Sequence, residues 1–263
     1  MKRPAEILRE HGLRPKKQWG QNFLGDARIL ESLAQLCGVR EGDTVVELGA
    51  GLGHFTRALA ATGARVVAVE RDRELAPILR AGLPGIEVVE ADAKSFDFSS
   101  FGRDVVVSGN LPYHLSSPIL FHLLDQRAAI RRAVLLLQRE VAERIAAGPG
   151  TRDYGLLSVL VQLVADARIG LQVDRRAFTP PPEVESSALV IDFLPSPRAE
   201  VRDEMRFRAV VKAAFAQRRK TLSNALKALP GGREALAAAG IDPRRRGETL
   251  SVAEFAAIER ALP

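Results

Sequence analysis

The chain has 263 residues, of which 46% are hydrophobic and 27% are charged, and its formal net charge is +6. This composition is typical of a soluble globular protein with one large domain and an appendage or with two domains, and no apolar run is long enough for a signal peptide or a membrane span. The single cysteine, Cys37, excludes an internal disulfide and fits a reducing compartment, so we expect a cytoplasmic protein.

The two ends of the chain are basic and its centre is acidic. Residues 1–20 carry six basic and two acidic side chains, and residues 195–263 carry fourteen and eight, which leaves a net charge of −4 on residues 21–194. This distribution favours a catalytic centre flanked by surfaces that bind a polyanion. The alternative is a solvated surface that is biased towards arginine.

The first 38 residues predict a basic arm, a loop that can close over a ligand, and a helix. Residues 4–18 are expected to form a short amphipathic helix and a basic arm, and residues 20–24 combine a glycine with two amides and two apolar side chains. A loop of that composition suits a small polar ligand. Asp26 is a suitable N-cap for a helix to about Leu36, and Gly38 is its C-terminal signal.

A glycine-rich turn follows the first expected strand, residues 44–48. Gly49, Gly51 and Gly53 alternate before a helix that continues to about Ala61. Glycines let the backbone approach a ligand closely, and the N-terminus of a helix points N–H groups at it, as in nucleotide-binding sites. The spacing is G-x-G-x-G rather than the G-x-G-x-x-G expected for dinucleotides, which favours a mononucleoside ligand.

Acidic residues follow the next two expected strands. Residues 65–69 end at Glu70, whose position suits a bidentate hydrogen bond to ribose hydroxyls. The alternative is a glutamate that caps a helix or pairs with neighbouring arginines. Residues 86–89 lead to Asp92, which suits an adenine amino group, while the N–H of Ala93 suits a ring nitrogen.

Residues 110–113, Asn-Leu-Pro-Tyr, carry the chemistry around which the chain is organised. They follow the apolar run 104–107 and are therefore expected at the carboxyl end of a buried strand, where open α/β sheets bind ligands. The side-chain oxygen of Asn110 and a main-chain carbonyl near Pro112 could hold the N–H groups of an exocyclic amino group and localise its lone pair. Tyr113 could stack on the extruded base. The alternative is an ordinary turn at the end of a strand.

The remainder of the first domain predicts one more strand, two helices and an antiparallel pair. The expected strand is 134–137, the first helix is 140–147, and the antiparallel pair is 167–173 with 187–193. Residues 154–164 are apolar and could form a helix or a strand, of which the helix is favoured. Between the paired segments, Phe178 precedes three prolines. Its ring could cover the second face of a base opposite Tyr113, or it could fill the core, the more common fate of a phenylalanine.

A linker at residues 195–197 precedes a helical pattern, so we expect domains at 1–194 and 195–263. The expected helices are 203–216, 219–229, 232–239 and 251–261. At the junction of the first two lie three consecutive cations, Arg218, Arg219 and Lys220, which suit a nucleic-acid phosphate backbone. Residues 244–246 form a second arginine cluster. The four histidines lack metal-ligand spacing, so no metal is expected.

These motifs, in this order, resemble the ribosomal RNA adenine N6,N6-dimethyltransferases, the KsgA/Dim1 branch of the family that also contains the Erm enzymes. The similar segments are 21–24, 47–53, Glu70, 92–93, 110–113, 178–182 and 218–222. The resemblance implies a Rossmann-like α/β domain that uses S-adenosylmethionine as methyl donor, with a smaller all-helical C-terminal domain. Ala50 stands where a proline is frequent and His114 where asparagine is common, which puts only fine geometry in doubt.

The resemblance also implies a role for each matching residue. Donor binding is expected from Gln21, Asn22, Leu24, Gly49, Gly51, Glu70, Asp92, Ala93 and Asn110. Catalysis is expected from Asn110, Leu111, Pro112, Tyr113 and Phe178, and RNA binding from Arg218, Arg219 and Lys220.

The implied reaction is dimethylation of two adjacent adenines in a hairpin loop near the 3′ end of small-subunit rRNA. The implied partner is small-subunit rRNA or its precursor particle, with no membrane and no metal, and the chain is expected to act as a monomer and to assist small-subunit maturation. Two alternatives are an Erm-like methylase of large-subunit rRNA and a non-catalytic nucleic-acid-binding or assembly factor. The glycine spacing disfavours a third, a nicotinamide dehydrogenase.

Overall fold

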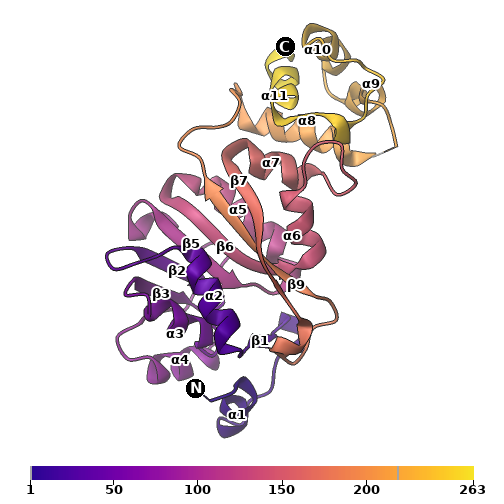
Figure 1. The fold of residues 1–263 in the computed structure, drawn as a ribbon. Helices are drawn as coiled ribbons and strands as arrows, with labels where there is room; N and C mark the ends of the chain where they lie inside the picture. The colour runs from indigo at the N-terminus through magenta and orange to yellow at the C-terminus, as the bar shows by residue number, and fades with distance from the viewer. Residues whose placement is uncertain (1, 218) are drawn as a thin grey trace. The chain divides into compact units, whose positions relative to one another are not determined.

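The computed structural model describes residues 2–217 and 219–263. It contains two compact units, one made of the residues up to Ala142 with Arg168–Phe193, the other of Glu143–Ala167 with Leu194–Pro263 (Figure 1). The units therefore differ from the division expected at residue 194, because residues 143–167 belong with the C-terminal helices. One physical reason is Tyr154, whose fully buried ring packs edge-on against Phe215 with 6.0 Å between ring centroids.

A seven-stranded sheet forms the core of the first unit. Its spatial order is β4-β3-β2-β5-β6-β9-β7. Neighbouring strands from β4 to β6 are parallel, and β9 is antiparallel to β6. The strands are β2 (Thr44–Leu48), β3 (Arg65–Val69), β4 (Glu87–Val89), β5 (Val105–Asn110), β6 (Ile130–Gln138), β7 (Ala165–Val173) and β9 (Ser186–Phe193). All seven segments were expected as strands, and the fold class is confirmed.

The register of the central strands brings their carboxyl ends to one edge of the sheet. Val45 of β2 pairs with Val66 of β3 on one side and with Val106 of β5 on the other. Because these strands are parallel, the residues that follow each of them emerge at the same edge. β-branched side chains at these positions are fully or almost fully buried, which accounts for the continuous apolar runs in the sequence.

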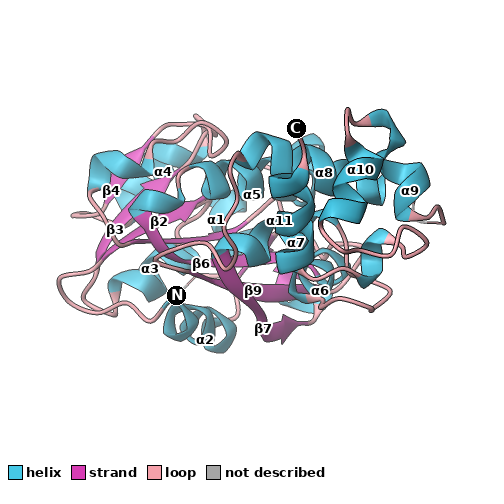
Figure 2. Cartoon of the chain, turned by 90° about the horizontal axis from the view of Figure 1, so that it is seen from above, coloured by secondary structure: helices cyan, strands magenta, loops and turns pink. Residues whose placement is uncertain are grey.

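Helices cover both faces of this sheet, and Figure 2 shows α2 and α5 on opposite sides of the strands. The helices of the unit are α1 (Pro4–Glu10), α2 (Ala27–Cys37), α3 (His54–Ala60), α4 (Leu75–Gly82) and α5 (Ser116–Asp125), and α6 (Arg139–Ala146) begins in it. Asp26 caps α2 by accepting the backbone N–H groups of Arg28 and Ile29, and Gly38 ends it in the left-handed conformation, as expected.

The N-terminal arm differs from the expected helix. Helix α1 ends at Glu10, and Gly12 follows with φ of +65°, so the helix covers only the first half of residues 4–18. A short 3-10 turn, η1 (Lys17–Trp19), leads to β1 (Phe23–Leu24). This strand pairs antiparallel with β8 (Phe178–Thr179), so two segments expected as loops form a small second sheet.

The second unit is almost entirely helical. Its helices are the end of α6, then α7 (Leu156–Val164), α8 (Glu204–Ala216), α9 (Leu222–Ala225), α10 (Gly232–Ala238) and α11 (Val252–Ala261). The expected helix 219–229 is shorter, because α9 passes into a 3-10 turn at Leu226–Ala228 before Pro230. Asp203 caps α8 by accepting the backbone N–H groups of Met205 and Arg206, and the fully buried Glu259 accepts the N–H groups of Arg202 and Asp203 just before the helix.

Candidate functional site

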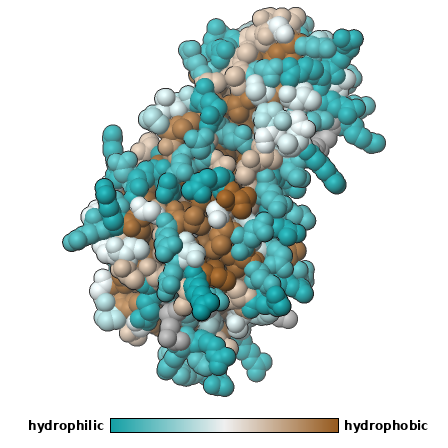
Figure 3. All heavy atoms as spheres, in the orientation of Figure 1, coloured by the Kyte–Doolittle hydropathy of each residue, from teal (hydrophilic) through white to brown (hydrophobic). Residues whose placement is uncertain are grey.

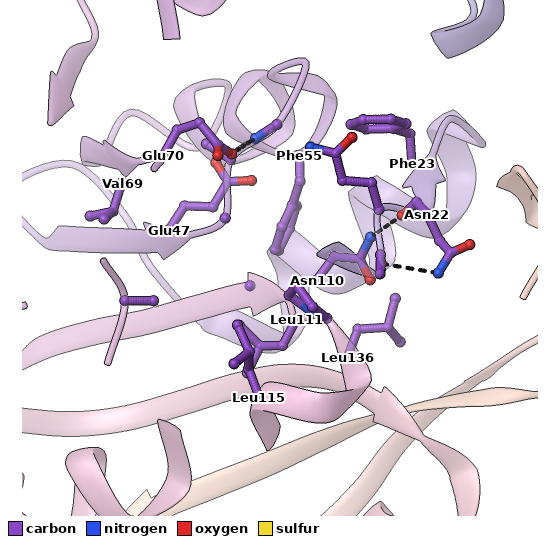
Figure 4. A pocket seen from close by; sticks show the side chains of 18 of the residues that line it. Asn22, Phe23, Glu47, Phe55, Val69, Glu70, Asn110, Leu111, Leu115 and Leu136 are labelled. Carbon is purple, nitrogen blue, oxygen red and sulfur yellow. Dashed lines mark hydrogen bonds between the residues drawn. The ribbon is translucent and has the colours of Figure 1, made fainter. Parts of the chain in front are cut away.

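A cavity of about 330 Å³ lies where the carboxyl ends of β2, β3 and β5 meet the N-terminal segment. Its volume is in the range of small-molecule sites. Figure 4 shows Glu47, Glu70, Asn110 and Asn22 around it, with the aromatic rings of Phe23 and Phe55. The lining includes all nine residues expected to bind the donor, namely Gln21, Asn22, Leu24, Gly49, Gly51, Glu70, Asp92, Ala93 and Asn110.

The glycines at this edge are required by close approaches of the backbone. Gly51 has φ of +57°, and a Cβ there would lie 3.2 Å from the ring of Phe23. A Cβ on Gly109 would lie 2.5 Å from the carbonyl oxygen of Leu48, where the side chain has no room. The turn after β2 and the end of β5 therefore approach each other as closely as glycine allows.

Glu70 is held in place by the backbone on both of its carboxyl oxygens. Oε2 accepts the N–H of Gly51 at 2.7 Å, and Oε1 accepts the N–H of Asp72 at 2.8 Å (Figure 4 shows the first). Burial raises the pKa of Glu70, and the two backbone donors oppose that rise. Each oxygen keeps a second lone pair, so the oriented carboxylate can accept from a pair of hydroxyls on a ligand.

Glu47 is a second carboxyl in the lining. The sequence pattern includes it in the segment 47–53 but predicts no role for its side chain. It is almost completely buried on β2, and its Oε2 has no hydrogen-bond partner among residues 2–217 and 219–263. Burial raises its pKa to about 8, and the nearby Glu70 carboxyl adds to the rise. The two carboxyls lie side by side in Figure 4. An unpartnered buried carboxyl in a cavity suits a ligand with a donor or a positive charge.

Asp92 lies at the cavity but is not free. Its Oδ1 accepts the N–H of Lys94 at 3.0 Å, and its Oδ2 lies 3.5 Å from both Arg71 Nη1 and Lys94 Nζ. The side chain is about one-third exposed, so these ion pairs are weak. The expected contact of Asp92 with an adenine amino group, together with that of Ala93, therefore stays a prediction.

Asn110 ends β5 with its amide oriented by the N-terminal segment. Its Nδ2 donates to the carbonyl oxygen of Asn22 at 2.8 Å, a bond drawn in Figure 4. Asn22 in turn donates from its own amide to the carbonyl of Gly20 at 3.2 Å. Because the nitrogen of Asn110 is committed, its side-chain oxygen is the group left to accept from a ligand.

The rest of the 110–113 motif is anchored to the sheet. Leu111 is buried, and the carbonyl of Pro112 accepts the N–H of Leu115 at 2.8 Å within a 3-10 turn. The hydroxyl of Tyr113 lies 2.7 Å from the hydroxyl of Ser186 on β9, which fixes the ring at its outer end. Burial raises the pKa of Tyr113, so its phenol is neutral near neutral pH.

Phe178 lies in the hydrophobic core beneath the small sheet. Its side chain is 2% exposed and belongs to a buried cluster with Leu24, Leu30 and Phe55. Stacking on a base would require this ring to leave its present position, and the role stays a prediction.

The cationic segments of the second unit differ in how many charges are available. Arg218 lies outside the described residues, and Arg219 and Lys220 are exposed. In the second cluster, Arg244 pairs with Asp242 and Arg245 pairs with Glu254. Long hydrophilic side chains project from this unit in Figure 3. The first cluster is therefore the better candidate for phosphate contacts.

No group of three or more His, Cys, Asp or Glu side chains in residues 2–217 and 219–263 is arranged to hold a metal ion. In the same residues, no helix is both long and apolar enough to cross a bilayer.

One family model and two known proteins match nearly the whole chain. Residues 12–262 match the family model described as ribosomal RNA adenine dimethylase. The chain is 55% identical to ribosomal RNA small subunit methyltransferase A of Myxococcus xanthus, covering 100% of this chain and 96% of that protein. It is 53% identical to the protein of the same name from Anaeromyxobacter sp. strain K, with 98% and 97% covered.

Solved structures also share the fold. The crystal structure of the 23S rRNA methyltransferase ErmE superposes with a TM-score of 0.72 at 26% identity and covers 92% of this chain and 99% of that one. A dimethyladenosine transferase from Plasmodium falciparum superposes with a TM-score of 0.73 at 23% identity, covering 90% and 95%.

Proposed function

The chain belongs to the ribosomal RNA adenine dimethylase family, and we propose that it transfers methyl groups from S-adenosylmethionine to N6 of two adjacent adenines near the 3′ end of small-subunit rRNA. The product is N6,N6-dimethyladenosine. The choice of the small subunit is supported by relatives of 53–55% identity that carry that name, against 26% for the 23S rRNA methyltransferase ErmE.

The observation that carries the chemistry is the hydrogen bond from Asn110 to the carbonyl of Asn22. The nitrogen of an adenine amino group is a weak nucleophile because its lone pair is delocalised into the ring. An acceptor fixed at the edge of the cavity can hold one N–H group and draw the lone pair out of conjugation. Asn110 supplies such an acceptor, since its amide nitrogen is already committed.

The residues around the cavity fit a methyl donor of this kind. Glu70 keeps a lone pair on each oxygen for the ribose hydroxyls, and the unpartnered oxygen of Glu47 suits a positively charged ligand. Gln21, Asn22 and Leu24 would border its methionine end, and Asp92 with Ala93 its adenine. The donor supplies a methyl group on a sulfonium, already activated for transfer, so positioning dominates over general-base catalysis.

The target base would be held between the motif and the adjoining strands. Tyr113 offers an aromatic face whose hydroxyl is fixed by Ser186, and a ring fixed at one end loses little freedom when a base stacks on it. Phe178 remains the candidate for the second face. Arg219 and Lys220, with Arg218, would contact phosphates and position the particle. We also propose that the protein acts as a monomer in the cytoplasm and takes part in small-subunit maturation.

The direct test uses tritiated S-adenosylmethionine and purified small subunits that lack the modification, followed by mapping of the labelled base. We expect label on two adjacent adenines near the 3′ end of the small-subunit rRNA. Label on large-subunit rRNA would favour the Erm-like alternative. Binding to the particle without transfer of label would favour an assembly factor.

A further inference from the structure

Residues 16–22, which we call the strap, form one wall of the cavity. Five consecutive strap residues, Gln18 to Asn22, line it. Apart from the 3-10 turn at Lys17–Trp19, the strap has no regular secondary structure. A segment of this kind has few backbone hydrogen bonds of its own to resist local opening.

The chain on both sides of the strap is anchored in the first unit. Before it, Leu8 of α1 is buried against Leu52 and Leu75. After it, β1 pairs with β8, with Leu24 opposite Phe178. The strap is therefore a short span between two fixed points, and its contacts in the middle decide whether it lies over the cavity or away from it.

Besides the hydrogen bond from Asn110 to the carbonyl of Asn22, two strap side chains meet at one buried carboxylate, Asp72, which is 1% exposed. Lys16 Nζ lies 2.7 Å from its Oδ1, and Gln21 donates from Nε2 to its Oδ2 at 2.8 Å. The same two residues are joined to each other, because the backbone N–H of Lys16 donates to Oε1 of Gln21 at 2.8 Å. Both side-chain donors to Asp72 thus come from the strap.

Asp72 is ionised because of these donors. Burial alone raises the pKa of Asp72, but hydrogen bonds from Lys16, from the backbone N–H of Glu74 and from Gln21 outweigh it and leave the pKa below its ordinary value. When the strap lifts away, a carboxylate buried in the protein loses two donors that only water can replace. Removing donors from a buried charge costs free energy, and this cost holds the strap in place.

The same residue is connected to the ligand side of the cavity. The backbone N–H of Asp72 donates to Oε1 of Glu70, one of the two carboxyl oxygens proposed to hold the ribose. The side chain of Asp72 holds the strap, and its main chain orients the ribose carboxylate. Because the carboxyl carbon and the backbone nitrogen of Asp72 are only three covalent bonds apart, movement of the carboxylate also shifts the N–H group that orients Glu70.

Trp19 adds a further contact and a natural reporter. Its ring lies 4.6 Å from Lys16 Nζ and 4.6 Å from the guanidinium carbon of Arg71. It is the one tryptophan in the sequence. Opening of the strap would separate Trp19 from Arg71 and expose the ring to solvent.

We propose that the strap is a gate on the donor site and that Asp72 is its latch, a positioning residue that controls donor exchange through Lys16 and Gln21. The proposal rests on the proposed function for the identity of the ligand. The donor enters and leaves when the latch opens, and with the latch closed it is enclosed between the strap and Glu70.

The test measures release of bound tritiated S-adenosylmethionine after addition of excess S-adenosylhomocysteine, in the full-length protein. We expect Asp72→Asn and Lys16→Met each to accelerate release roughly 10- to 100-fold, the factor implied by loss of one charge-assisted hydrogen bond. Acrylamide quenching of Trp19 fluorescence should rise in both variants without ligand. The double variant should release no faster than the faster single variant, because both changes open the same latch.

The matched control is Glu74→Gln. Glu74 also pairs with Lys16, at 2.5 Å, but its side chain is 54% exposed, whereas that of Asp72 is almost completely buried. This variant should release ligand within about twofold of the wild type, as expected for an exposed pair. Lys16→Met carries the test if Asp72→Asn fails to fold.

Equal release rates in wild type, Lys16→Met and Asp72→Asn would overturn the latch. Additive acceleration in the double variant, or equal acceleration by Glu74→Gln, would also overturn it. A wild-type protein that retains no labelled donor would instead reject the proposed function itself.

Discussion

Glu47 gives the protein a pH-dependent stability whose size follows from its burial. Its carboxyl has a pKa of about 8 in the folded chain and an ordinary value of 4.5. The folded state therefore holds a proton that the unfolded state has lost between these values, and stability falls as pH rises through this window. From about pH 7 to about pH 8.5, the difference in proton binding amounts to a loss of roughly 1 kcal/mol.

The experiment compares urea unfolding of the ligand-free wild type and Glu47→Gln near pH 7 and near pH 8.5. Glutamine keeps the shape of the neutral carboxyl without a titrating proton, so the loss of about 1 kcal/mol should disappear in the variant. His54 has a lowered pKa and changes charge below its ordinary value of 6.5, outside this window, and Cys37, raised from 9.0 to about 12, contributes little below pH 9. The same decline in both proteins would show that Glu47 is already ionised at neutral pH, and the reasoning from its burial would be wrong.

Three further predictions concern the proposed reaction. Glu70→Ala should weaken binding of S-adenosylmethionine by about 1–3 kcal/mol, and unchanged affinity in calorimetry would remove Glu70 from the ribose role. Asn110→Ala should lower the rate of single-turnover methyl transfer by about 100-fold at saturating donor, with little change in RNA affinity. A rate within a few-fold of wild type would show that Asn110 only ends its strand and has no part in catalysis. Replacing Arg218, Arg219 and Lys220 by alanine should flatten the salt dependence of RNA binding by about 0.7–0.9 log units per lost phosphate contact, with donor affinity as the control.

The sheet could be predicted from the sequence because its signal is local. Each buried parallel strand is a run of apolar, often β-branched residues. The turn after residues 44–48 is indicated by three alternating glycines. Helix α4 (Leu75–Gly82) was not anticipated. It contains Pro77 in its first turn, where the missing N–H would have no partner in any case, so a residue that reads as a helix breaker is tolerated there.

The division into units could not be predicted, because it depends on partners rather than on pattern. The linker at residues 195–197 is visible in the composition, and it does begin the longer segment of the second unit. Nothing in the apolar run of α7 indicates which neighbour it packs on. One contact that joins the two segments is that of Tyr154 with Phe215, residues that are 61 positions apart in the sequence.

The residues of the candidate site that end strands could be predicted from the sequence. The residues that orient those side chains could not. Glu70 and Asn110 stand at the ends of apolar runs, where a polar residue is conspicuous. Asp72 and Ser186 are unremarkable in the sequence, yet Asp72 accepts from two strap residues more than 50 positions away and Ser186 fixes Tyr113 from 73 positions away. Long-range hydrogen bonds leave no periodic trace in a sequence.

The same limit applies to the ionisation states of three neighbouring carboxyls, of which two line the cavity and the third, Asp72, lies beside Glu70. Glu47, Glu70 and Asp72 have similar ordinary pKa values, but the pKa of Glu47 is raised to about 8 while that of Asp72 is lowered. The difference arises because Lys16 and Gln21 reach Asp72, whereas one oxygen of Glu47 has no partner in the described part of the chain. Which acidic residue is charged, and which can respond to a cationic ligand, is therefore decided by the fold around each residue rather than by its identity.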